Sequence, residues 1–340
     1  MLTPPFDSLV EHLAAHYPGL GRPLELKPLS FGFAVSNSLF EYTTPSGRFL
    51  LKAMAHPTAL YGQPDVVERL ELVSTAIQEL RHARLPVEEI VAGHDDRFVQ
   101  EYDDHLLRLY VFDSGRAFAD PDGDCRRAAS ALRSLHLEGL SCLRGATRQS
   151  LTPFKRAYPL ATTASELPAL RAFLEEQAVT VPAYAKILEQ WDLIEWAVAR
   201  ALSHPPFSQE TKCLVHTDFH PRNALFNDDR EEATMIDLDN MVIDGRLTCL
   251  GFSILRFAFF QQERTPTALD AAMAIFAEQE CSKPGFMDDL VHAMIHLEIE
   301  KVVRILHRVR TTGQYAAFVD NVCPLHLANL KILRASFCRE

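Results

Sequence analysis

The sequence predicts an α+β fold in which an antiparallel sheet with one helix precedes a larger, mainly helical region. Short strand-like apolar runs, separated by turn residues, occupy residues 24–112. Beyond Gly115 apolar residues recur at three- and four-residue spacing, which is typical of amphipathic helices. The chain has 340 residues and is 47% hydrophobic, which suits about two domains with a large core.

The first predicted elements are one helix and three strands. Helical spacing of apolar residues favours a helix over 5–16, and two strands are expected within 24–42. The segment Thr-Thr-Pro-Ser-Gly at 43–47 is expected to form a turn before a third strand over 48–54. Lys52 is the only charged residue in the interior of that third strand, which marks it as a candidate functional group.

A second helix and two more strands complete the predicted sheet region. The helix is expected over 64–83, because Pro64 suits its first turn and Asp65 suits its positive end. The strands are expected over 97–102 and 106–112, on either side of an Asp-Asp-His turn.

The remaining chain is expected to be helical apart from one segment rich in polar groups. An acidic loop is expected over 239–245. Helices are expected over 124–137, 153–158, 166–176, 184–202, 268–280, 286–307 and 321–337.

The polar segment places Asp218, Asn223 and Asp237 at spacings that suit phosphoryl transfer. Such a site needs a carboxylate beside the accepting hydroxyl, and oxygen ligands for the magnesium ions that clamp the phosphates. Predicted strands over 224–226 and 233–236 form a hairpin with Asn223 before it and Asp237 after it. This hairpin can bring both side chains to one cation.

Two motifs in this segment resemble a known family of enzymes. His-x-Asp-x-x-x-x-Asn begins at His216, and Ile-Asp-x-Asp begins at Ile236. They resemble the catalytic and metal-binding motifs of the aminoglycoside phosphotransferase and choline kinase family, which includes homoserine kinase-like members. The resemblance implies a two-lobed, protein-kinase-like fold with an N-lobe over 1–111 and a C-lobe over 112–340.

The resemblance also implies how a nucleotide is held. Lys52 is expected on the phosphates of ATP, and the loop containing Ser36 and Asn37 is expected to cover the nucleotide. The hinge backbone at Tyr110 and Val111 is expected to meet the adenine edge. Without the family motifs, Lys52 would instead be interpreted as an amphipathic surface lysine.

A carboxylate from the second helix is expected to hold the Lys52 ammonium in such a fold. Glu71 and Glu68 are the candidates, and Glu71 is favoured by its position relative to the family-typical Leu-Pro-Val at 85–87. The alternative for either glutamate is a solvated helix face.

The expected mechanism uses ATP and Mg²⁺. Asn223 and Asp237 are expected to hold the metal, while Asp218 orients the acceptor hydroxyl and accepts its proton. Asp239 and Asp244 are expected either to meet a cationic acceptor or to lie in water. The acceptor is expected to be an aminoglycoside, amino sugar, amino alcohol or homoserine-like molecule.

The segment 245–251 departs from the family pattern and keeps an alternative open. Relatives have an aspartate near this position that braces the catalytic loop, whereas this chain has Gly-Arg-Leu-Thr-Cys-Leu-Gly. A catalytically silent nucleotide-binding protein, acting through partners, is therefore the second hypothesis. A protein kinase is disfavoured, because no Ala-Pro-Glu segment or long activation loop follows Asp237.

Bulk properties limit the partners and the compartment. The formal charge of −11 disfavours a nucleic-acid partner and is compatible with a cationic substrate. Seven scattered cysteines, without a Cys-x-x-Cys pair, indicate free thiols and a cytoplasmic location. No secretory signal or membrane-length apolar run is found, so no membrane partner is expected.

Overall fold

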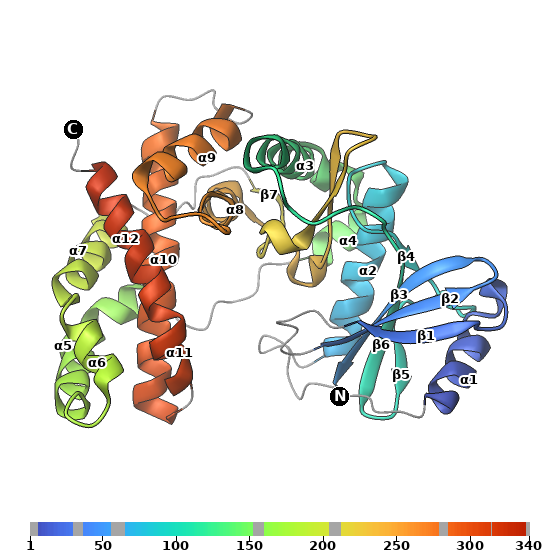
Figure 1. Ribbon diagram of the computed structural model, residues 1–340, viewed down its shortest axis with the longest axis horizontal. Coiled ribbons are helices and arrows are strands. Elements are labelled where there is room, and N and C mark those ends of the chain that lie inside the picture. Colours follow the sequence, from blue (N-terminus) through green and yellow to red (C-terminus); the bar gives the residue numbers. More distant parts are fainter. Residues whose placement is uncertain are drawn as a thin grey trace. The chain divides into compact units, whose positions relative to one another are not determined.

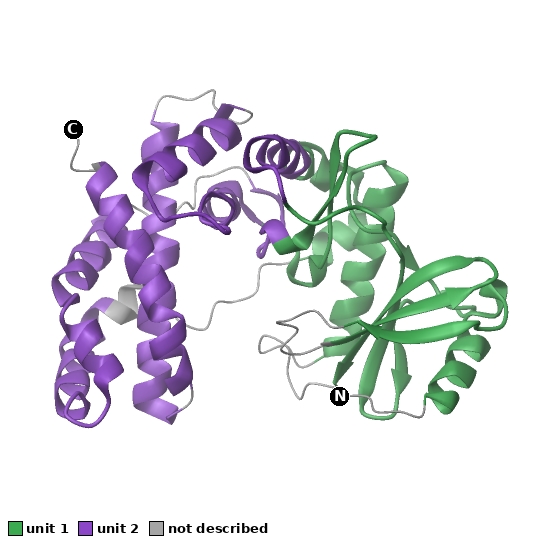
Figure 2. Cartoon of the chain, in the orientation of Figure 1, with its two compact units in different colours: residues 1–118, 134–153, 222–243 green, residues 119–133, 154–221, 244–340 purple. Residues whose placement is uncertain are grey.

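The computed structural model describes residues 6–29, 37–55, 65–151, 160–203, 212–278, 285–313 and 315–337. The chain forms two compact units (Figure 2). Unit 1 contains Met1–Phe118, Ser134–Pro153 and Arg222–Ile243, and unit 2 contains Ala119–Arg133, Phe154–Pro221 and Asp244–Glu340.

Unit 1 is built on an antiparallel sheet, as the sequence predicted (Figure 1). Its strand order is β1-β2-β3-β6-β4, and β5 pairs with another part of β6. The strands are β1 (Glu25–Leu29), β2 (Asn37–Thr44), β3 (Gly47–Ala55), β4 (Ile90–Val91), β5 (Gln100–Tyr102) and β6 (His105–Val111).

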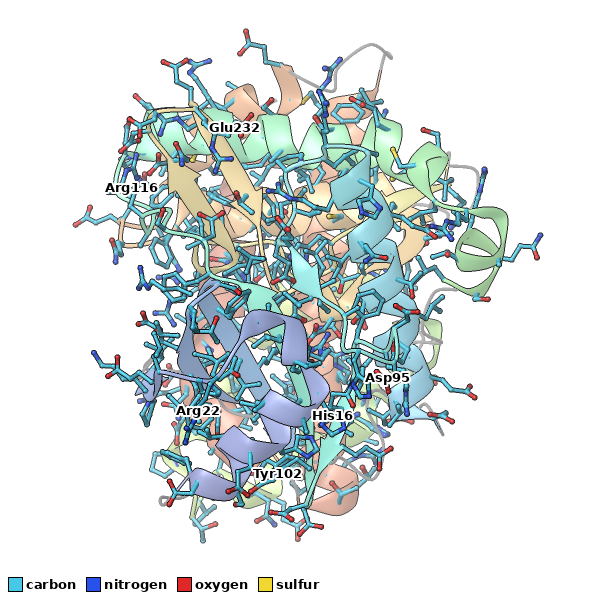
Figure 3. All side chains as sticks on the ribbon, turned by 90° about the vertical axis from the view of Figure 1, so that its right-hand side faces the viewer. His16, Arg22, Asp95, Tyr102, Arg116 and Glu232 are labelled. Carbon is cyan, nitrogen blue, oxygen red and sulfur yellow. The ribbon has the colours of Figure 1, made fainter. Side chains whose placement is uncertain are left out.

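Helix α1 (Asp7–His16) closes one face of this sheet through an apolar core. Leu9 and Leu13 are buried in one cluster with Phe40 of β2 and Leu51 of β3. The helix also reaches β5, because the Ser8 hydroxyl lies 2.6 Å from that of Tyr102, which Figure 3 labels near His16. Burial of these side chains stabilises the sheet by about 1.5–3 kcal/mol per large apolar residue.

Helix α2 (Val66–His82) begins at an N-cap residue, Asp65, whose carboxylate accepts the Glu68 N–H at 2.9 Å. Near its other end, the buried carboxylate of Glu79 accepts the Arg144 N–H at 2.9 Å and the Thr147 hydroxyl at 3.0 Å. These bonds tie α4 (Gly145–Ser150) to α2. They explain why residues 134–153, expected in the second lobe, pack with the sheet.

A hairpin joins unit 1 for a similar reason. Strands β8 (Ala224–Asn227) and β9 (Glu232–Met235) pair in antiparallel fashion, as expected from the sequence. Met235 then donates to the Pro86 carbonyl and accepts from the Glu88 N–H, both at 2.8 Å. The compact units therefore follow these contacts and differ from a boundary at 111/112.

Unit 2 is mainly helical, and α10 (Phe286–Thr312) packs against α5, α7, α8 and α12 (Figure 1).

The loop expected over 239–245 instead contains a 3-10 turn (Leu238–Asn240) and strand β10 (Val242–Gly245). The other elements are α3 (Pro121–Cys142), α5 (Leu160–Gln177), α6 (Pro182–Leu188), α7 (Trp191–Ser203), β7 (Lys212–Val215), α8 (Arg246–Ala258), α9 (Pro266–Glu278), α11 (Ala316–Asn321) and α12 (Cys323–Phe337).

One helical prediction needs correction, and one long helix was not predicted. The single helix expected over 184–202 is two helices, α6 and α7, separated at Glu189 and Gln190. The Gln190 side chain donates to the Lys186 carbonyl, and the Gln190 carbonyl accepts the N–H groups of Leu193 and Ile194. Helix α8 was not expected, although its apolar residues recur at helical spacing.

The helix predicted at 153–158 lies outside the described residues. Among the helices that the structure describes, none combines the length and the apolar character that crossing a bilayer requires.

Candidate active site

Lys52 is the centre of a buried charged cluster in unit 1. Its Nζ lies 2.5 Å from Oδ1 of Asp237 and 2.5 Å from Oδ2 of Asp239. Burial opposes its charge, but the carboxylates of Asp239 and Asp237 raise the pKa of Lys52 above its ordinary value. Lys52 therefore remains a cation at neutral pH.

Arg108 is a second buried cation in this cluster and was not predicted from the sequence. Its Cα lies opposite that of Lys52 in the β3–β6 register, and its side chain is only 2% exposed. Two like charges in facing positions repel. Oδ2 of Asp239 offsets this repulsion, because it contacts Arg108 Nη2 at 2.7 Å as well as Lys52.

Asp239 is therefore an internal ion-pair residue. Burial opposes its ionisation, but Arg108 and Lys52 hold the pKa of Asp239 well below its ordinary value. Its Oδ1, like Arg108 Nη1, has no hydrogen-bond partner in the part of the chain that the structure describes.

Glu88 adds a third carboxylate to the surroundings of Lys52 and was also missed. Its Oε1 accepts the Leu238 N–H at 3.2 Å, which connects the segment after Val87 to the end of the hairpin. Burial raises the pKa of Glu88 to about 7, although the nearby Lys52 acts in the opposite direction. The charge of the cluster therefore depends on pH near neutrality.

The expected pairing of Lys52 with a glutamate of α2 is wrong for this structure. The Glu71 carboxylate accepts the N–H groups of Phe98 and Val99 at 3.1 and 2.9 Å, and it lies 3.5 Å from Arg97. Glu68 is exposed. Glu71 thus holds the segment before β5, and Asp237 and Asp239 occupy the place that was assigned to it.

Asn223 and Asp237 flank the hairpin as predicted. The Ile236 N–H donates to the Asn223 carbonyl at 3.0 Å, so Asp237 follows the residue bonded to Asn223. Asp237 has a left-handed backbone, with φ of 61° and ψ of 48°, and its side chain is 43% exposed. A strained conformation at a non-glycine residue is a feature found at functional sites.

The donor set at the hairpin fits magnesium. Mg²⁺ usually binds through one or two carboxylates, together with waters and phosphate oxygens, and does not need an all-protein cage. An amide oxygen at Asn223 and a half-exposed carboxylate at Asp237 meet this requirement. Within the described residues, no group of three or more His, Cys, Asp or Glu side chains could hold a metal.

Asp218 lies in unit 2 on a loop fixed by its own neighbours. The Asp218 N–H donates to Nδ1 of the buried His216 at 3.3 Å, and Oδ2 of Asp218 lies 3.9 Å from His220 Nε2. The Asp218 side chain is 46% exposed. The Cys249 thiol donates to the His216 carbonyl at 3.1 Å, so a cysteine contacts the loop in the segment that lacks the family's aspartate.

The nucleotide-covering and hinge residues are placed only in part. Ser36 lies outside the described residues, and Asn37 begins β2 opposite Met54. Tyr110 is buried and pairs with strands on both sides. The Val111 N–H donates to the Glu89 carbonyl at 2.8 Å, so this amide already has a partner within the protein.

Of the two carboxylates expected to meet a cationic acceptor, the Asp239 side chain is 11% exposed and the Asp244 side chain is 39% exposed. Asp239 is enclosed between Lys52 and Arg108. Asp244 contacts Lys212 Nζ at 2.8 Å and also accepts the Gly245 N–H. Both side chains already have cationic partners within the protein.

Solved structures with the same fold are small-molecule kinases. Spectinomycin phosphotransferase, in complex with ADP and spectinomycin, has a TM-score of 0.63 at 13% identity, covering 97% of this chain and 98% of its own. Amicoumacin kinase, bound to AMP-PNP, Ca²⁺ and its substrate, has a TM-score of 0.63 at 13% identity, with coverages of 98% and 94%. Choline kinase from Cryptosporidium parvum has a TM-score of 0.54 at 14% identity, with coverages of 98% and 96%.

Family membership comes from the sequence model. A search of curated proteins gives no match. The model of the phosphotransferase enzyme family matches residues 25–278, which include Lys52, the Asp218 loop and the β8–β9 hairpin. The chain therefore belongs to the phosphotransferase enzyme family.

Proposed function

We propose that this enzyme transfers the γ-phosphoryl group of ATP to a hydroxyl group of a small molecule. The observation that carries the proposal is the contact between Lys52 of β3 and Asp237 at the end of the hairpin. A cation for phosphate and a carboxylate for a divalent metal lie together in one unit. Phosphoryl transfer depends mainly on such positioning and charge neutralisation.

In this proposal Lys52 binds the phosphate oxygens while Asp239 keeps its ammonium in place. Asn223 and Asp237 hold Mg²⁺, which would neutralise charge on the phosphates when bound. Lys52 can leave Asp237 without losing its other carboxylate partner. The ion pair with Asp239 is therefore compatible with a metal ion on Asp237.

Asp218 is proposed to orient the acceptor hydroxyl and accept its proton. It precedes Asn223 by five residues, so the chain itself keeps the two within roughly 17 Å. A strong base is not required, because proton transfer can follow most of the bond change at phosphorus. Relatives of known structure carry spectinomycin or choline in their names, which supports a small-molecule acceptor here.

The metal role is tested by acceptor-dependent ADP release at a series of Mg²⁺ concentrations. Asp237→Asn is expected to raise the Mg²⁺ concentration for half-maximal rate by about 10-fold or more. Asp228→Asn is the matched control, because Asp228 lies in the same hairpin region, is exposed and pairs with Arg116 at 2.7 Å. An unchanged Mg²⁺ dependence in Asp237→Asn would remove Asp237 from the metal site.

The same assay separates the enzyme from a silent nucleotide-binding protein. If MgATP raises the melting temperature but no acceptor in a broad panel of alcohols stimulates ADP release, the binding protein is the better account.

A further inference from the structure

Helices α8 and α10 of unit 2 approach each other closely beside the Asp218 loop. A Cβ added at Gly251 would lie 3.1 Å from the Met294 side chain and 3.6 Å from Leu297, which shows how tightly the helices pack. Beyond this contact, Phe252 and Leu297 line a small pocket that also includes Thr217, the residue before Asp218. The Asp244 carboxylate lines the same pocket.

One helical turn further, each helix presents a cation. Arg256 follows Phe252 by four residues, and Lys301 follows Leu297 by four, so both lie on the pocket side of their helices. The Arg256 guanidinium lies 5.0 Å from the centre of the Phe252 ring. The Phe252 ring, which lines the pocket, is therefore in contact with the positive charge of Arg256.

Within the described residues, these two cations form no ion pair, although the Glu298 carboxylate acts on both electrostatically. In the described part of the chain, neither Arg256 nor Lys301 has a carboxylate at ion-pairing distance. The nearby Glu298 is buried and its Oε2 contacts His326 Nδ1 at 2.7 Å. The Glu300 carboxylate lies 3.7 Å from Arg304 Nη1.

Asp218 lies close enough to Lys301 to affect its pKa. The pKa of Lys301 is lowered, by burial first and by Arg304 and Arg256 next, while Asp218 and Glu298 act in the opposite direction. Phe219, which follows Asp218, packs against Phe257 at a ring-centre distance of 5.4 Å, and Phe257 adjoins Arg256. The Asp218 loop and the two cations therefore lie close together in unit 2.

We propose that the acceptor carries an anionic group, a carboxylate or a phosphate, which Arg256 and Lys301 bind while the acceptor hydroxyl lies at Asp218. This inference rests on the proposed kinase function and names the acceptor class. A guanidinium presents paired donors to a planar carboxylate or a phosphate, and an ammonium adds a point charge. A purely cationic acceptor would be repelled here, and Asp239 and Asp244 are already engaged by Lys52 and Lys212.

The test compares acceptors that differ only in the anionic group. The pairs are homoserine with 3-aminopropanol, serine with ethanolamine, and glycerol 3-phosphate with glycerol. Acceptor-dependent ADP release gives kcat/KM for each, and calorimetry gives their binding to the enzyme with MgADP. In at least one pair, kcat/KM is expected to be about 10- to 100-fold higher for the acid than for its partner. Whether this difference occurs in a carboxylate pair or in the phosphate pair shows which anionic group is bound.

Arg256→Gln and Lys301→Met assign the preference to residues. Each is expected to reduce the ratio of kcat/KM between the acid and its partner by about 10-fold or more, with KM for ATP as the internal reference. Arg126→Gln is the matched control, because Arg126 also lies in unit 2, is exposed and pairs only loosely with Glu278 at 3.4 Å. Either substitution alone is sufficient if the other variant does not fold.

Two results would overturn the inference. One is equal use or equal binding of the two members of every pair, and the other is an unchanged ratio in both Arg256→Gln and Lys301→Met. Binding of the acids with MgADP, lost in these variants but without phosphoryl transfer to any acceptor, would uphold the anion site and refute the kinase function instead.

Discussion

Replacing Asp239 with asparagine tests the charged cluster around Lys52. The substitution keeps the shape of the side chain but removes the charge that lies between Lys52 and Arg108. Lys52 retains Asp237, whereas Arg108, which is 2% exposed, loses its ion-pair partner in the described structure. The variant therefore leaves a buried guanidinium with Glu88, which lies beyond ion-pairing distance, as its remaining counter-charge.

The expected cost follows from burial and from the number of contacts. Removing one partner of a buried ion pair usually costs about 3–5 kcal/mol. Because asparagine can still accept one hydrogen bond, we expect the lower value, about 3 kcal/mol. At about 2–4 °C per kcal/mol, the melting temperature should fall by about 6–12 °C.

Urea unfolding, with hydrogen exchange of the β3 and β6 amides, measures this loss where it arises. Asp228→Asn is again the control, because its ion pair with Arg116 is exposed and should contribute less than about 1 kcal/mol. Adding Arg108→Met to Asp239→Asn removes the unpaired charge, so the double variant should be more stable than Asp239→Asn alone.

The pH dependence provides an independent check. The folded-state pKa of Asp239 is depressed, so its stabilisation is present above its unfolded pKa of about 4 and is lost as pH falls below that value. The difference between wild type and Asp239→Asn should shrink in acid. A loss in Asp239→Asn no larger than in Asp228→Asn, at neutral pH, would refute the reasoning.

Three further changes test neighbouring groups. Lys52→Met should weaken ATP binding by about 10- to 100-fold, measured by calorimetry, because it removes a charge-assisted contact. Glu71→Gln should lower the unfolding free energy by about 1 kcal/mol, because it weakens the bonds to the Phe98 and Val99 amides, while KM for ATP stays unchanged. A large rise in KM for ATP would instead support the predicted pairing of Glu71 with Lys52. The unfolding free energy of Glu88→Gln should equal that of wild type near pH 4 and exceed it by on the order of 3 kcal/mol above pH 7. The reason is that the raised pKa makes ionised Glu88 unfavourable only in the folded state. A difference between the two proteins that does not change with pH would contradict this.

Much of the fold was predictable because local patterns and tertiary packing agree. The apolar runs became the antiparallel sheet, and the segment around Asp218 and Asp237 gave the loop and the hairpin in their expected order. Helix α8 was not predicted, although its apolar residues recur at helical spacing, because its N-cap residue, Gly245, has no side chain that marks a helix start. The break between α6 and α7 has no proline or glycine to announce it.

The charge pairing was less predictable, because partners on distant segments are set by register. Lys52 was singled out as a lone charge in an apolar strand, and the same signal was present for Arg108, between Leu107 and Leu109. Only the β3–β6 pairing shows that the two face each other. Glu71 was predicted from its position along the helix, but its carboxylate accepts the backbone N–H groups of Phe98 and Val99.

Phosphate transfer from γ-labelled ATP to an acceptor, by wild type and by Asp218→Asn at saturating MgATP, tests the central claim most directly. Wild type should label the acceptor, and the variant should bind MgATP normally while its kcat falls by about 10²- to 10⁴-fold. Labelling by Asp218→Asn at the wild-type rate would contradict the proposed role of the Asp218 loop in the transfer.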